Sequence, residues 1–162
     1  MSLTAEVNRG LPAEGEPDGQ AQLLVSTFYL RDALFALDTG LVEEVVRLRR
    51  TTRVARAPGY VLGIMNLRGK IVTVLDLAEI LQLEKTTAGE ESRLYIVRDG
   101  DGLAGLLVDR AADVIELDSA ALEPPPASVR GAEGRFFQGI ARAGGPLVAV
   151  LDLAAVLSLE GL

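Results

Sequence analysis

Short apolar runs separated by polar or glycine-containing turns extend along most of the chain, and this pattern predicts a mainly β protein. The runs are rich in valine, isoleucine, leucine and aromatic residues, which strands favour. The predicted strands cover 22–30, 33–37, 41–48, 61–67, 70–75, 94–97, 103–108, 112–117, 136–143 and 146–151. Short helices are predicted at 76–83 and 152–159, because Asp76 and Asp152 have side chains suited to an N-cap. Glu79 makes the first helix start similar to a capping box.

The chain contains an internal repeat. Residues 63–81 and 139–157 are identical at 10 of 19 positions, which indicates a duplicated unit. Each half has the same order of predicted elements, namely a hairpin, a strand, a second hairpin and a short helix. About five short strands in each half, with sheet edges that need cover, predict two small barrels rather than one open sheet.

Two further correspondences between the halves are expected from the local sequence. Arg98-Asp99 resembles Arg31-Asp32, and both are predicted to lie at the turn of the first hairpin of their half. Asp113 is expected to occupy the position in the second half that Glu44 has in the first.

The remaining segments divide the chain into a tail and a domain. Residues 1–20 combine several glycines and prolines with four acids and one arginine, and are expected to form a disordered acidic tail. The domain then covers 21–159. Within it, three consecutive prolines at 124–126 predict a long ordered connection at 118–135.

The charge balance narrows the possible partners. A net charge of −7 and an isoelectric point of about 4.7 argue against nucleic acids and anionic membranes, because phosphate groups require a basic face. No apolar run approaches the roughly 18 residues that span a bilayer, and the N-terminus does not have the pattern of a signal peptide. We therefore expect a cytoplasmic protein without direct membrane insertion.

The chain has neither histidine nor cysteine. This composition excludes Ser-His-Asp and Cys-His catalysis, disulfide bonds, and imidazole or thiolate metal ligands. No catalytic residue, metal or cofactor is therefore predicted. The alternative from another class is an enzyme that uses the carboxylate of Asp76 or Asp109 in a groove between the barrels. The predicted N-cap position of Asp76 favours a structural role for that carboxylate instead.

Arg68 lies in a predicted hairpin turn where the second copy of the repeat has Gly144, so the turn itself does not require an arginine. We expect Glu44 to pair with Arg68, because it lies in a mostly apolar run and a partly buried carboxylate requires a partner. A solvated Glu44 is the alternative. Five arginines between Arg47 and Arg56 form either a solvated loop or a docking patch for an acidic partner.

The stretch that contains Arg68 also resembles a known family. Residues 63–77, Gly-Ile-Met-Asn-Leu-Arg-Gly-Lys-Ile-Val-Thr-Val-Leu-Asp-Leu, are similar to the G-x-x-N-L-R-G-x-I-x-P-V-x-D-L signature of CheW-type chemotaxis coupling proteins. The resemblance covers about 22–159 and includes the segments 42–45 and 107–109. The chain departs from the signature at Thr73, where the family usually has proline.

The resemblance implies a fold of two intimately packed, five-stranded SH3-like β-barrels with short helices. It also implies a non-catalytic adaptor that couples the cytoplasmic tips of chemoreceptors to the regulatory domain of a CheA-type histidine kinase. The residues that match the family's receptor-binding groove are Val42, Glu44, Asn66, Leu67, Arg68 and Gly69. The alternatives within this class are a scaffold of a CheW-like, non-motility chemosensory pathway, and a paralogue that has lost one binding surface.

Overall fold

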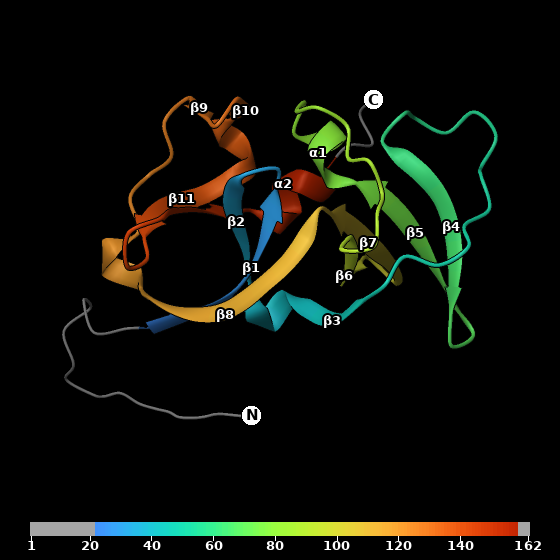
Figure 1. Ribbon diagram of the computed structural model, residues 1–162, viewed down its shortest axis with the longest axis horizontal. Coiled ribbons are helices and arrows are strands. Elements are labelled where there is room, and N and C mark those ends of the chain that lie inside the picture. The colour runs from blue at the N-terminus through green and yellow to red at the C-terminus, as the bar shows by residue number, and fades with distance from the viewer. Residues whose placement is uncertain (1–21, 159–162) are drawn as a thin grey trace.

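The computed structural model describes residues 22–158 and consists mainly of two five-stranded β-sheets (Figure 1). The first sheet has the strand order β11-β12-β2-β1-β8, with β1 Gln22–Leu30, β2 Ala33–Asp38, β8 Arg110–Asp118, β11 Phe137–Arg142 and β12 Leu147–Leu151. The second has the order β3-β6-β7-β5-β4, with β3 Val42–Val46, β4 Val61–Leu67, β5 Lys70–Asp76, β6 Arg93–Asp99 and β7 Gly102–Val108. The predicted mainly β fold with two five-stranded units is confirmed.

Each sheet combines strands from both halves of the repeat. In the first sheet, the β1–β2 hairpin of the first half pairs with β8 and β12 of the second half. In the second sheet, the β6–β7 hairpin of the second half pairs with β3 and β5 of the first half. Figure 1 shows this exchange in its colours, since blue and orange strands share one sheet. Neither half of the repeat therefore forms a sheet by itself.

Both sheets curl so that their two end strands share a core, as a small barrel requires. In the second sheet, Val46 of β3 packs in the same apolar cluster as Met65 of β4. In the first sheet, Leu117 of β8 and Ala141 of β11 belong to one cluster. In both sheets these are the strands at opposite ends of the order, so the side chains close each sheet on itself.

A third and larger apolar cluster lies between the two barrels and joins them. It contains Phe28 of β1 and Tyr95 of β6, whose rings are tilted with centroids 5.0 Å apart. The buried Tyr95 hydroxyl donates a hydrogen bond of 2.7 Å to the backbone carbonyl of Thr27, which lies at a register shift in the β1–β8 ladder. The barrels are thus fixed together by apolar packing and by one buried polar contact.

We expect Tyr95→Phe to lower the free energy of unfolding by about 1–2 kcal/mol, because the buried Thr27 carbonyl would lose its donor. Burial also raises the pKa of the Tyr95 phenol, so the stability that its neutral form contributes is lost as the pH rises through that raised value. Urea denaturation at neutral and alkaline pH measures both effects. Tyr60→Phe is the matched control: Tyr60 is partly buried without a hydroxyl partner among the described residues, and we expect a change below about 0.5 kcal/mol. Equal losses in the two variants would contradict the role of the Tyr95 hydrogen bond.

The predicted helix starts are confirmed, but both helices are shorter than expected. Helix α1 spans Leu77–Ile80 and α2 spans Leu153–Leu157, and each is capped by the aspartate that precedes it. A capping box does not form at α1, because the Asp76 backbone N–H donates to the Tyr60 carbonyl. The α1 segment cannot continue as a helix through Gln82, which has φ of +63°.

The long connection predicted at 118–135 is ordered but not without secondary structure. It contains the short hairpin of β9 Ser128–Val129 and β10 Ala132–Glu133 and a 3₁₀ turn at Ser119–Ala121, and a second 3₁₀ turn, Gly134–Phe136, follows. A third 3₁₀ turn, Thr39–Leu41, links β2 to β3. The tail predicted at 1–20 lies outside the described residues, and no helix within 22–158 is long and apolar enough to cross a membrane.

Candidate functional site

The turn between β4 and β5 contains Arg68, where the second copy of the repeat has Gly144. Arg68 has φ of +51° and the following Gly69 has φ of +86°, as in the tight turns that match the twist of a hairpin. The Asn66 side-chain oxygen accepts a hydrogen bond of 3.0 Å from the Gly69 N–H and closes the turn. A non-glycine residue in this conformation costs about 1–2 kcal/mol, and the second copy avoids that cost with Gly144, whose φ is +67°.

The Arg68 guanidinium donates to the Glu44 carboxylate, so the ion pair predicted from the sequence is confirmed. Glu44 lies on β3 and Arg68 follows β4, which are the two end strands of the second sheet. The pair therefore bridges the seam where this barrel closes. The side chain of Arg68 is 63% exposed and that of Glu44 is 36% exposed, so both charges remain accessible to solvent.

The other barrel does not have this pair. The strand pairings place Asp113 on β8 where Glu44 lies on β3, since Val114 lies opposite Ser26 as Val45 lies opposite Tyr95. Asp113 is exposed and has no ion-pair partner within 22–158, because the matching turn has glycines in place of an arginine. The ion pair between an acid and an arginine is thus present on one barrel, although both barrels have the strand and the hairpin turn that would carry it.

The structure separates the remaining predicted site residues into surface and interior positions. Asn66 and Gly69 are exposed beside Arg68, whereas Leu67 is buried in the core of the second barrel. Val42, at the start of β3, is half-buried and packs against the core between the barrels. Leu67 and Val42 therefore position the strands that present Glu44 and Arg68.

Sequence reasoning did not identify Ile71 as a surface residue. Ile71 lies directly opposite Asn66 in the β4–β5 ladder and is 56% exposed. The signal was available in the alternation along β5, where the neighbouring Val72 and Val74 point into the core. An exposed isoleucine beside the Arg68 turn adds apolar contact area to the charged pair.

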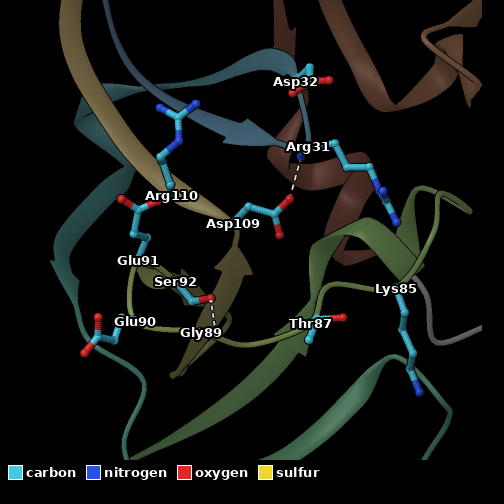
Figure 2. Close-up of a pocket in the computed structure, with 10 residues that line it drawn as sticks. All are labelled: Arg31, Asp32, Lys85, Thr87, Gly89, Glu90, Glu91, Ser92, Asp109 and Arg110. Atoms are coloured by element: carbon cyan, nitrogen blue, oxygen red, sulfur yellow. Dashed lines mark hydrogen bonds between the residues drawn. The ribbon is translucent and has the colours of Figure 1, made fainter.

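The pocket in Figure 2, of about 600 Å³, lies at the tip of the β1–β2 hairpin and tests the alternative of a carboxylate enzyme. Its lining residues are Arg31, Asp32, Lys85, Thr87, Gly89, Glu90, Glu91, Ser92, Asp109 and Arg110. Asp109 follows β7 of the second sheet and precedes β8 of the first, so it lies where the chain passes between the barrels. Its carboxylate accepts a hydrogen bond of 2.5 Å from the Arg31 backbone N–H, drawn as a dashed line in Figure 2. The Asp109 carboxylate thus holds the tip of the β1–β2 hairpin in place.

Asp76 does not line this pocket. Its side chain is fully buried and accepts hydrogen bonds from the backbone N–H groups of Glu79, at 3.3 Å, and Thr86, at 3.2 Å. Burial raises the pKa of the Asp76 carboxyl, and the two backbone hydrogen bonds oppose that rise. Asp76 and Asp109 therefore have separate structural roles, one as a helix cap and the other as a hairpin anchor.

The sequence of this chain is similar to the sequences of known proteins over most of its length. The sequence profile of the CheW-like domain matches residues 24–161. "Chemotaxis protein CheW" from Treponema pallidum is 31% identical over 145 residues, which cover 87% of this chain and 84% of the relative. "Chemotaxis protein CheW" from Klebsiella aerogenes is 27% identical over 146 residues, covering 90% and 86% of the two chains.

A solved structure is also similar over most of its length. The crystal structure of the scaffolding protein TtCheW from Thermoanaerobacter tengcongensis superposes with a TM-score of 0.80 at 32% identity, covering 88% of this chain and 97% of the other. The profile match over most of the chain and the 31% identity to the Treponema pallidum relative show the family. The chain belongs to the CheW-like domain family.

Proposed function

We propose that this protein is a non-catalytic coupling scaffold of chemotaxis that joins the cytoplasmic tip of a chemoreceptor to the regulatory domain of a CheA-type histidine kinase. The observation that carries the proposal is the exposed Glu44–Arg68 pair at the seam of one barrel, on a turn that the fold can also build from glycine. The names of its relatives support the proposal, since they are called chemotaxis proteins and, in one case, a scaffolding protein.

The packing between the barrels supports a mechanism based on rigid positioning. The apolar cluster between the barrels and the Tyr95–Thr27 hydrogen bond hold the two barrels at a fixed angle. A receptor bound beside Arg68 and a kinase bound elsewhere on the barrels would then be held at a fixed separation. A small change in the receptor would shift the population of active kinase, because the rigid connection transmits differential binding to the two kinase states.

We expect Arg68→Ala to fold normally and to lose receptor coupling. An exposed ion pair contributes about 0–1 kcal/mol, so the free energy of unfolding should change by no more than about 1 kcal/mol. The loss of the guanidinium should abolish the co-sedimentation of the protein with receptor-containing membranes and kinase. Thermal melting and co-sedimentation measured on the same samples test both parts.

Arg98→Ala is the matched control for Arg68→Ala. Arg98 is 66% exposed and forms its own ion pair with Glu43, at 3.5 Å, so the two substitutions remove the same kind of contact. A swapped pair, Glu44→Arg with Arg68→Glu, separates the salt bridge from the recognition of arginine itself. Full coupling by Arg68→Ala, or an equal loss with Arg98→Ala, would contradict the proposed role of Arg68.

A further inference from the structure

The loop that connects β3 to β4 carries an unbalanced cluster of positive charge. Its arginines are Arg47, Arg49, Arg50, Arg53 and Arg56, and all five are exposed. Across residues 22–158, none of the five forms an ion pair with an acidic side chain. Since the whole chain has a net charge of −7, this loop differs in sign from most of the molecule.

The loop is held against the edge of the second sheet and encloses a groove. Thr52 exchanges two backbone hydrogen bonds of 2.8 Å with Ile64 of β4, so the loop crosses the outer edge of the β4–β5 hairpin. A cavity of about 410 Å³ remains between them. It is lined by Arg49, Arg50, Thr52, Ile64, Met65, Asn66 and Ile71.

The groove combines apolar and cationic groups. Ile71 on one wall is 56% exposed, and Val54, which is 44% exposed, lies on the arginine loop. Two of the unpaired arginines, Arg49 and Arg50, belong to the lining. Arginine beside accessible apolar side chains is typical of the centre of protein interfaces, because the guanidinium forms charge-assisted hydrogen bonds to carboxylates.

We propose that this groove docks an acidic segment of a partner protein, whose carboxylates pair with Arg49 and Arg50 while one apolar side chain enters the cavity beside Ile71. Charge complementarity favours an acidic partner segment, because no acidic side chain among the described residues pairs with the arginine cluster. The concave, partly apolar lining favours a side chain over a flat bilayer, and the net charge of −7 opposes nucleic acids and anionic membranes. The groove adjoins the Arg68 turn through Asn66, but Arg68 itself is not part of its lining.

The test uses the full chain and a fluorescein-labelled peptide of aspartates and glutamates around one central leucine. Fluorescence anisotropy should detect binding by the native protein that weakens as salt is added. The variant Arg49→Glu with Arg50→Glu should bind the peptide at least about tenfold more weakly, because two charge-assisted contacts become repulsive. Replacing the peptide leucine with serine should weaken binding to the native protein but not to an Ile71→Ser variant.

Arg135→Glu with Arg142→Glu is the matched control, since it changes the net charge equally at two exposed arginines of the first barrel. We expect this control to keep the native affinity, and thermal melting checks that each variant folds. Equal weakening by both double variants would overturn the proposal in favour of general electrostatic attraction. Tighter binding of phosphatidylserine vesicles or single-stranded RNA than of the peptide would also overturn it. So would stronger peptide binding after removal of residues 1–20, which would make that segment the occupant.

Discussion

Val74→Asp is expected to unfold the protein. Val74 is fully buried on β5, between Gly63 of β4 and Gly105 of β7, and its side chain belongs to the core of the second barrel. A carboxylate there would have no cationic partner and no water. An unpaired buried charge costs several kcal/mol, which is comparable with the whole stability of about 5–15 kcal/mol of a typical domain. Circular dichroism at room temperature should therefore show loss of the native β signal.

Ile71→Asp provides the control for Val74→Asp, because it places the same charge on the same strand at a position that is 56% exposed. We expect this variant to retain its fold and to lose no more than about 1 kcal/mol. Cooperative melting of Val74→Asp close to the native temperature would show that β5 does not face the core as described.

Gly63→Ala is expected to destabilise the protein by about 2–3 kcal/mol. Gly63 has φ of +150° and lies at a register shift in the β4–β5 ladder. A Cβ atom there would lie 2.4 Å from the backbone carbonyl oxygen of Thr52, at the point where the arginine loop pairs with β4. The substitution thus combines backbone strain with a collision against main-chain atoms, which cannot move aside as a flexible side chain can.

Two other glycines separate these contributions in urea denaturation experiments. Gly69 has φ of +86°, but a Cβ atom there would meet no other atom within 4 Å, so Gly69→Ala should cost only the backbone strain of about 1–2 kcal/mol. Gly102 has neither a positive φ nor a close neighbour, so Gly102→Ala should change stability by less than about 0.5 kcal/mol. If Gly63→Ala cost no more than Gly69→Ala, the close approach of the Thr52 backbone would not matter energetically.

The same close approach explains why a glycine begins each copy of the repeat. In the second copy, a Cβ at Gly139 would lie 2.6 Å from the carbonyl oxygen of Glu123. Glu123 exchanges backbone hydrogen bonds with Ile140, as Thr52 does with Ile64. In each barrel a connecting segment therefore crosses the first strand of the repeated hairpin at the point where that strand carries no side chain.

The strands were predictable because alternation and turn residues are local signals. Residues 22–30 and 61–67 were predicted with the bounds that the structure has. The Glu44–Arg68 pair was also predictable, since Glu44 lies in a mostly apolar run where its carboxylate requires a partner, and the turn itself does not require Arg68. The local signal was less reliable for the first hairpins: the final ladder pairs are Leu30 with Ala33 and Asp99 with Gly102. Arg31-Asp32 therefore corresponds to Gly100-Asp101, and the predicted correspondence with Arg98-Asp99 was wrong by two residues.

The exchange of hairpins between the sheets could not be predicted in this way. The parallel pairs of β5 with β7 and of β12 with β2 join segments that are far apart in sequence, and either hairpin has the apolar pattern to fill either place. Their partners are determined by the core between the barrels rather than by any local pattern. The groove beside the arginine loop also depends on a tertiary contact, because it is enclosed where Thr52 of the loop pairs with Ile64 of β4.

The exchange of hairpins also makes the two barrels one thermodynamic unit. The single connection between the halves, residues 81–92, leaves a piece of each barrel on either side of it. Detaching one half of the chain would open two sheets at once and expose the core between them. Partial unfolding that opens one barrel while preserving the other is therefore disfavoured, and the arrangement of the two barrels is protected by the stability of the entire molecule.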